Sequence, residues 1–512
     1  MHPRSAVRTA PSHLLLLVAL GLGGCMQLGP DFQSPVEPWA RSWKSPALAL
    51  ASQHQAEPDT LSWWRVFGDP LLDQLIAQAD AHNADLKIAG LRVLEARAQL
   101  GIARSGRYPQ VQQASADSLY VHRDQYGGNN PLDNHFWQYS AGFDIGWELD
   151  FWGRFSRAIE SADAQYFASR ANQDDVRVLL RAQVADTYFS LRTTEARLRV
   201  ARENAGLQQR SFQITEKLFN SGQSAELDVQ QAKTQYLATL SGIPTLEDQA
   251  LRLRNTLAVL MGRPPGLLTE WVEHQAPVPL IDRAVLQDVP ANLLLRRPDV
   301  RAAELNVAAQ SALIGVAESD FYPSLSLLGS IVWSADTLKG TSKSLDLVGG
   351  PSLRWNLFDH GQISNNVRVQ DARLQQLIEA YRDKVRQAAR EADDAASGLV
   401  KSLERERILR EAGVAAQRSL VLASAQYREG YSDFQRVLDA QRALLEQQDN
   451  YLLSRGNAVS NLIALYKALG GGWYSAQPSV DPVSRQQMEA RTDWGDLLQE
   501  PVRPSPEELK RP

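Results

Sequence analysis

The fold is decided by the stretch Val369-Gln370-Asp371-Ala372-Arg373-Leu374-Gln375-Gln376-Leu377-Ile378 and its surroundings, from Ile363 to Arg428. This segment has no proline and only two glycines, Gly398 and Gly413, so little in it would interrupt a helix. Its apolar residues recur every seven positions, which is typical of helices that pack along a narrow seam and supercoil. The two series are Leu374, Tyr381, Ala388 and Ala395, and Ile378, Val385, Ala392 and Leu399. At 1.5 Å per residue, the segment predicts a helical rod of roughly 100 Å.

The same pattern occurs a second time, 208 residues earlier in the chain. A shift by this offset carries Trp355 onto Trp147, Gly430 onto Gly222 and Gly470 onto Gly262. A constant offset over so long a span indicates an internal duplication with almost no insertions. The twin of the rod is Ser156–Phe219, which is also free of proline.

Strand-like alternation precedes each rod. In His135–Leu149 the odd positions from Trp137 are apolar or small and the even positions are polar or glycine, over a length that crosses a bilayer as a tilted strand. A preceding strand is expected at about Val111–His122, and the segments around Leu325–Trp333 and Leu347–Leu357 repeat the pattern. We expect lipid to face Trp137, Phe143, Ile145, Trp147, Ile331, Trp333, Leu353 and Trp355, with Asp144 and Arg354 on the opposite, lumen face. A soluble, half-buried hairpin is the alternative, because alternation alone does not distinguish lipid from a protein core.

The N-terminus has the features of an export signal. Arg4 and Arg8 precede the apolar run Leu14–Leu22, which is too short to span a membrane. The tetrad Leu22-Gly23-Gly24-Cys25 resembles the bacterial lipobox, which predicts a signal peptide over 1–24 and lipidation of Cys25; in lipoproteins of this kind, Met26 in the next position points to the outer membrane. The alternative is an ordinary secretory signal with an incidental cysteine. Cys25 is the only cysteine, so the exported chain forms no internal disulfide.

The remaining segments complete a tandem architecture. Residues 25–62 are expected to be a lipid-anchored extended segment. The first repeat, 63–262, would contain a helix over Leu71–Ser105, a β-hairpin at about 109–150 and a long helical hairpin at about 156–261, with a break at Pro244. A proline-rich connector, 263–298, would join it to the second repeat, 299–472, with a helix, a β-hairpin at about 322–358 and a long helical hairpin at about 363–469. Residues 473–512 are expected to be an irregular tail.

Composition and motifs argue against catalysis. The net charge of −5 and the lack of a basic block do not suggest nucleic acid as a partner. The sequence has no CxxC, HExxH, GxSxG or phosphate-binding glycine-rich motif, so we expect no enzyme activity, cofactor or metal. The adjacent pairs Asp174-Asp175 and Asp393-Asp394 would point to different helix faces, and we expect them on a solvated or lumen-facing surface.

Five short motifs, in order, resemble the TolC-type outer membrane factor family, in particular its NodT-like lipoprotein branch of efflux channels. They are Gly29-Pro30-Asp31-Phe32, Trp63-Trp64 with Phe67-Gly68-Asp69-Pro70, Trp147-Glu148-Leu149-Asp150-Phe151-Trp152-Gly153, Arg296-Arg297-Pro298-Asp299-Val300 and Leu438-Asp439-Ala440-Gln441-Arg442. The resemblance implies a mixed α+β membrane protein: a homotrimer with a 12-stranded transmembrane β-barrel, four strands from each protomer, continued by a coiled-coil α-helical barrel in the periplasm. It also implies a periplasmic adaptor and an inner-membrane efflux pump as partners.

The number of copies depends on this resemblance. Four strands do not close a transmembrane barrel, and an open edge in lipid leaves backbone groups unpaired, so the chain must pool strands with copies of itself. The sequence alone allows two, three or four copies; only the resemblance selects three.

The resemblance also implies functional positions. Asp439 and Arg442 correspond to residues that constrict the periplasmic end, and Gln435 stands where some relatives place a leucine. An intrahelical Asp439–Arg442 pair is the plainer interpretation. The turns between rod and returning helix, with Gly222 and Gln223 and with Gly430 and Tyr431, are candidates for adaptor docking.

We therefore expect a passive outer membrane channel of a tripartite efflux system that conducts drugs or other small solutes from pump and adaptor to the outside. The alternatives are an outer-membrane lipoprotein that acts as a structural stalk or receptor, and the outer channel of a protein secretion system. The transported substrates cannot be inferred from the sequence.

Overall fold

The computed structural model describes residues 26–37, 61–122, 135–266, 277–282, 291–336, 343–475 and 478–499. Cys25 and the signal segment lie outside these ranges. The chain divides into two compact units: one contains the chain up to Pro35, Glu95–Ala168 and Glu304–Ala380, and the other Val36–Leu94, Ser169–Ala303 and Tyr381–Pro512. Each is described by itself.

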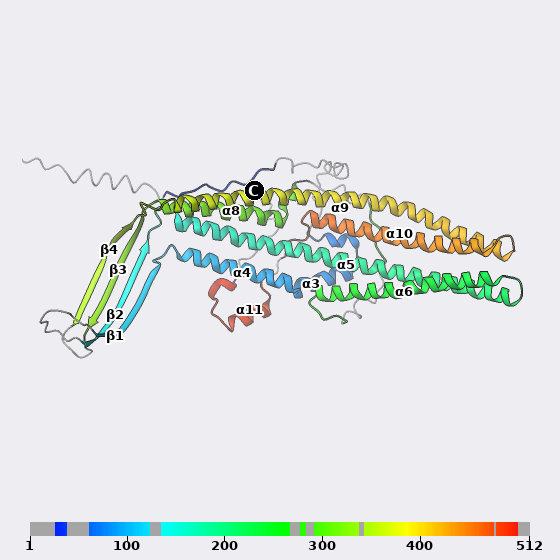
Figure 1. Ribbon diagram of the computed structural model, residues 1–512, viewed down its shortest axis with the longest axis horizontal. Coiled ribbons are helices and arrows are strands. Elements are labelled where there is room, and N and C mark those ends of the chain that lie inside the picture. The colour runs from blue at the N-terminus through cyan, green and yellow to red at the C-terminus, as the bar shows by residue number, and fades with distance from the viewer. Residues whose placement is uncertain are drawn as a thin grey trace, which may run out of the picture. The chain divides into compact units, whose positions relative to one another are not determined.

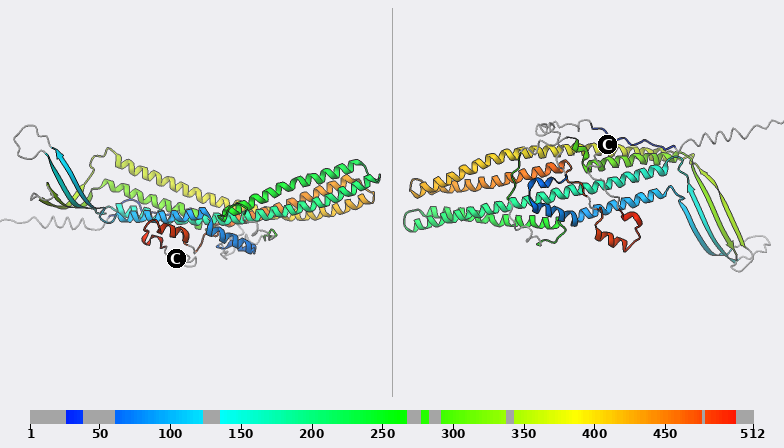
Figure 2. Two further views of the ribbon diagram at one scale, coloured as in Figure 1. Left: turned by 90° about the horizontal axis from the view of Figure 1, so that it is seen from below. Right: turned by 180° about the vertical axis from the view of Figure 1, so that it is seen from behind.

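The predicted duplication is confirmed by the helices. Helices α5 (Arg154–Asn220) and α9 (Gln362–Arg428) each contain 67 residues, and the returning helices α6 (Glu226–Leu260) and α10 (Phe434–Ala468) each contain 35. The 208-residue offset carries both ends of α5 onto α9 and both ends of α6 onto α10. Each rod forms an antiparallel hairpin with its returning helix (Figures 1 and 2).

The first unit contains one antiparallel sheet, in which the strands occur in the order β1-β2-β3-β4. The strands are β1 (Val111–His122), β2 (His135–Glu148), β3 (Ser324–Ala335) and β4 (Lys343–Arg354). Within the described residues, β1 and β4 each pair on one side only, which leaves two open edges. The helix α8 (Pro298–Glu318) and a short 3-10 turn, η6 (Ser319–Phe321), lead into β3.

The core of the second unit forms around buried aromatic and aliphatic side chains. The 3-10 helix η3 (Trp63–Phe67) places Trp63 parallel to Tyr466 with 5.3 Å between ring centroids, and Trp64 donates from its indole to Asp73 over 2.8 Å. The seven-residue seam is buried from Tyr381 to Leu399, as the periodicity predicted. None of the helices in the described ranges combines the length and the apolar character needed to cross a lipid bilayer.

The expected single helix over Leu71–Ser105 is wrong, because Asn83 divides it into α3 (Pro70–His82) and α4 (Ala84–Ser105). Asn83 is extended at ψ 131°, accepts from the Leu86 amide at 3.1 Å and donates to the Leu260 carbonyl at 3.0 Å. Its side chain therefore caps the second helix and joins it to the end of α6.

The expected break at Pro244 is also wrong, because α6 continues through it. Pro244 is exposed, so water can bond to the carbonyl four residues earlier that proline leaves without a partner.

The tail is not irregular throughout. It contains α11 (Pro482–Glu489) and the 3-10 helix η7 (Gly495–Leu498). Val480 and Leu498 are buried against Leu94 of α4, and this apolar contact gives the segment a folding partner that its proline content did not suggest.

Candidate functional site

Antiparallel register places the predicted membrane-facing residues of the sheet on one face. Phe143 lies opposite Ile331, and Ile331 lies opposite Leu347. Directly opposed residues share a face, as do residues two apart along a strand. This row therefore assigns the same face to Trp137, Ile145, Trp147, Trp333 and Leu353. Trp355 follows the end of β4, and its indole donates to the Phe321 carbonyl at 2.9 Å.

The other face of the sheet carries carboxylates. Asp117 lies opposite Ser140, Asp144 opposite Ser330, and Asp346 opposite Val332. Arg354, the predicted lumen-facing cation, lies on this face at the end of β4, opposite Ser324. The charged residues of this face are mainly acidic, and apolar residues such as Leu328, Val332 and Val348 lie among them, whereas the opposite face carries the aromatic and aliphatic row.

The two turns between rod and returning helix have the same geometry. Gly222 and Gly430 adopt φ of 75° and 80°, which favours glycine. The next residue in each turn, Gln223 or Tyr431, donates its amide to the carbonyl five residues earlier, at 2.8 Å and 2.9 Å. This is a Schellman cap. Tyr431 is 84% exposed, so the second turn presents an aromatic side chain to solvent.

The gate candidates lie together on α10. Gln435 donates to Asp439 at 3.0 Å, and Asp439 lies 3.6 Å from an Nη of Arg442. Arg442 also donates through Nε to Gln235 of α6 at 2.8 Å. Gln235 was not found from the sequence, because only the packing of α6 beside α10 brings it to this cluster. The predicted intrahelical pair is therefore present, and its cation also joins the two repeats.

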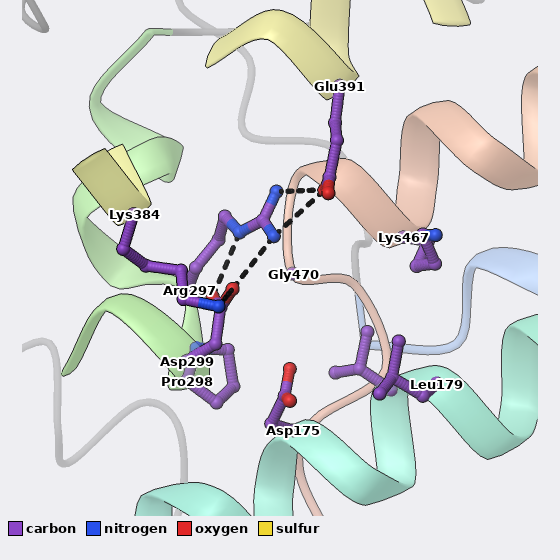
Figure 3. A pocket seen from close by; sticks show the side chains of 10 residues that line it. Asp175, Leu179, Arg297, Pro298, Asp299, Lys384, Glu391, Lys467 and Gly470 are labelled. Atoms are coloured by element: carbon purple, nitrogen blue, oxygen red, sulfur yellow. Dashed lines mark hydrogen bonds and ion pairs between the residues drawn. The ribbon is translucent and has the colours of Figure 1, made fainter. Parts of the chain in front are cut away.

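A second charged cluster surrounds Arg297 of the Arg296–Val300 motif (Figure 3). Arg297 bonds to Asp299 through two nitrogens at 2.9–3.0 Å, to Glu391 of α9 at 3.0 Å, and to the Ala468 carbonyl at 2.8 Å. One guanidinium thus joins the start of α8, the middle of α9 and the C-terminus of α10, where carbonyls need donors.

A cavity lies beside Arg297 and Asp299. Asp175 of α5 lines it, together with Lys384, Glu391 and Lys467. Among the described residues, no hydrogen bond or ion pair reaches its carboxylate. Burial raises the pKa of Asp175 to about 6, and the negative charge of Asp299 adds to the rise while Arg297 opposes it. The structure thus contains a partly buried carboxylate whose charged form is disfavoured.

The expectation of a solvated surface for both aspartate pairs is wrong for three of the four residues. Asp174 is buried and bonds to Arg177 at 2.9 Å, Asp175 is partly buried, and one carboxylate oxygen of Asp393 is buried without a hydrogen-bond partner. A buried carboxylate beside a buried arginine is a structural ion pair. Asp394 is exposed and pairs with Arg390 at 3.2 Å.

The N-terminal segment is attached to the first unit by several hydrogen bonds, and most of them come from one buried arginine. The side chain of Arg157 is 3% exposed and donates to the Leu28 carbonyl at 2.8 Å, the Gly29 carbonyl at 3.1 Å and Asp31 at 2.9 Å. The segment also passes so close to α8 that a Cβ on Gly315 would lie 2.4 Å from the Leu28 carbonyl oxygen. The motif Gly29-Pro30-Asp31-Phe32 therefore lies where the N-terminal segment contacts Arg157 and α8.

Comparison with known proteins identifies the relatives of this chain. The profile of the family described as Outer membrane efflux protein matches residues 75–263 and 289–471. The pyoverdine export outer membrane protein OpmQ of Pseudomonas putida is 32% identical, over 92% of this chain and all of OpmQ. The cation efflux system protein CusC of Escherichia coli K12 is 31% identical, over 90% of this chain and all of CusC. The probable outer membrane lipoprotein SilC of Salmonella typhimurium is 30% identical, over 88% and 96%.

Solved structures are similar over the same extent. The outer-membrane channel OprN superposes with a TM-score of 0.80 at 34% identity, covering 87% of this chain and 99% of OprN. A structure of CusC superposes with a TM-score of 0.73 at 27% identity, covering 87% of this chain and all of that one.

Proposed function

The chain belongs to the outer membrane efflux protein family and is the outer membrane channel of an efflux system, and we propose that it is a passive duct for drugs or other small solutes. The observation that carries this proposal is the sheet: one face carries the aromatic and aliphatic row, the other carries the carboxylates, and the edges at β1 and β4 are open. An open edge in lipid leaves backbone donors and acceptors without hydrogen-bond partners. Each unpaired group costs about 2–7 kcal/mol of folding free energy. The edges therefore require partners.

Copies of the same chain supply these partners in the proposal. The β1 edge of one copy pairs with the β4 edge of the next, and three copies close a barrel of twelve strands. The apolar face meets lipid, and Asp117, Asp144 and Asp346 line the lumen. A carboxylate-lined lumen favours cationic and neutral solutes over anions.

The helical hairpins form the periplasmic part of the duct. The exposed turns at Gly222, Gln223, Gly430 and Tyr431 dock a periplasmic adaptor, which connects the channel to an inner-membrane pump. The cluster of Gln435, Asp439 and Arg442 narrows the channel at this end. Because Arg442 also bonds to Gln235 of the other repeat, separating the hairpins would break the cluster.

Lipidation of Cys25 adds a second attachment to the outer membrane. The hydrogen bonds from Arg157 to the Leu28 and Gly29 carbonyls hold the chain only a few residues after the cysteine. This limits how far the lipid can lie from the first unit. Metabolic labelling with a fatty acid tests this: wild type should be labelled and Cys25→Ser should not. Label on the Ser variant would contradict the proposal.

The duct itself is tested by mass and conductance. Native mass spectrometry of detergent-purified protein should give three copies, and the same sample should conduct ions in a planar bilayer. A stable single copy without conductance would instead support a stalk or receptor.

A further inference from the structure

The end of the β1–β2 pair away from α4 and α5 carries two histidines in direct register (Figure 1). His122 lies opposite His135, and their Nδ1 atoms are 2.5 Å apart. The ring centroids are 4.3 Å apart with 17° between the ring planes. Because the nitrogens are much closer than the centroids, the rings meet at their Nδ1 edges instead of overlapping face to face. The two nitrogens therefore point at a common position.

A row of aromatic rings supports the pair. Tyr120 lies 5.4 Å from Trp137 between ring centroids and 6.4 Å from His135, parallel to within 2°. Tyr139 continues the row, 6.3 Å from Trp137. The register places all these rings on the apolar face of the sheet, and such contacts restrict the imidazole before anything binds. The histidines themselves are exposed, so a solute can reach them.

Two imidazole nitrogens that face each other at this distance need a proton or a metal ion between them. Lone pairs on both would repel, and protons on both would clash, so the position holds either one shared proton or a metal ion. Neutral imidazole is the commonest metal ligand in proteins and suits zinc, copper and nickel. Metal–nitrogen bonds of about 2.0–2.1 Å require the nitrogens to separate by roughly half to one ångström, which exposed side chains can do by small rotations.

We propose that His122 and His135 form a binding site for a divalent transition-metal ion of the zinc, copper and nickel class. Across the described parts of the chain, no group of three histidine, cysteine, aspartate or glutamate side chains is placed to hold a metal. The pair thus supplies two ligands and water completes the coordination, so the ion is exchangeable. When bound, it links the ends of β1 and β2.

Zinc titration tests the site on the full-length protein in detergent, purified without a histidine tag. Isothermal titration calorimetry near pH 7.5 should show one Zn²⁺ per chain. Losing even an outer-shell partner of a metal ligand costs about 10- to 100-fold in affinity, so His122→Gln and His135→Gln should each weaken binding at least tenfold. His82→Gln is the matched control: this imidazole donates from Nδ1 to the Gln78 carbonyl at 3.0 Å, and its loss should leave binding unchanged.

Two further measurements keep the proposal falsifiable if a variant assembles poorly. The electron paramagnetic resonance spectrum of Cu²⁺ bound to wild type should show two coordinating nitrogens. Zn²⁺ affinity should also fall as the pH is lowered, because protons compete with the metal for the same lone pairs. Zn²⁺ binding that survives both glutamine substitutions would overturn the site. So would the absence of Zn²⁺ binding in wild type, which would leave a shared proton between the rings.

Discussion

Replacing Asp175 with asparagine should stabilise the folded protein at neutral pH and have little effect in acid. The carboxylate is partly buried, has no hydrogen bond or ion pair among the described residues, and has a pKa raised to about 6 from a model-peptide value of 3.8. A raised folded-state pKa means that the folded protein binds the proton more tightly than the unfolded chain does. Stability from this group is therefore fully present below about pH 3.8 and is lost as the pH rises to about 6.

The size of the effect follows from the shift. At about 1.36 kcal/mol for each pKa unit, ionised Asp175 destabilises the fold by about 3 kcal/mol at pH 8. Near pH 4 the folded carboxyl is protonated and the unfolded one has only begun to ionise, so the same linkage leaves only about 0.5 kcal/mol. Asparagine is always neutral, so Asp175→Asn should gain up to about 3 kcal/mol at pH 8 and no more than about 0.5 kcal/mol at pH 4.

The neighbouring residue provides a matched control. Asp174 bonds to buried Arg177 at 2.9 Å, and removing one partner of a buried pair typically costs about 3–5 kcal/mol. The same substitution, Asp174→Asn, should therefore destabilise the protein at pH 8. Guanidinium unfolding in detergent, followed by tryptophan fluorescence at both pH values, compares the three proteins. The reasoning fails if Asp175→Asn unfolds at or below the wild-type midpoint at pH 8, or if its gain is equal at both pH values.

Three other predictions concern the sheet, the tip and the N-terminal segment. Ile145→Arg should reduce the yield of assembled trimer, because arginine on a lipid-facing strand costs about 2–4 kcal/mol at the bilayer midplane, whereas Asp144→Asn should assemble normally and reduce cation selectivity; equal yields would reject the assigned faces. Arg442→Ala removes the link to Gln235 and should raise single-channel conductance in planar bilayers, while unchanged conductance would assign the cluster to helix stability. Arg157→Ala leaves two carbonyls without their donor, at about 1–3 kcal/mol each, and should expose the N-terminal segment to limited proteolysis. The exposed Arg154 pairs at 3.4–3.8 Å with Asp320 and Glu148, so Arg154→Ala should be cut no faster than wild type; equal protection of both variants would remove Arg157 from this role.

Local signals in the sequence were enough for the long helical hairpins and for β1. The seven-residue period from Tyr381 to Leu399 marks a seam that is buried in the structure, and the ends of β1 agree with the expected Val111–His122. The 208-residue offset reproduces the ends of both long helical hairpins. These features depend on periodicity, glycine caps and proline positions within a few turns of chain, so a sequence is sufficient to predict them.

Contacts between distant segments were decided only by the tertiary structure. Asn83 ends a helix because its amide reaches Leu260, and the tail folds because Val480 and Leu498 find Leu94. Periodicity along one helix carries no information about which side chain a second helix places beside it. The partner of Arg442, the isolation of Asp175 and the meeting of two histidines across a strand pair therefore depend on packing, which joins residues that the sequence separates.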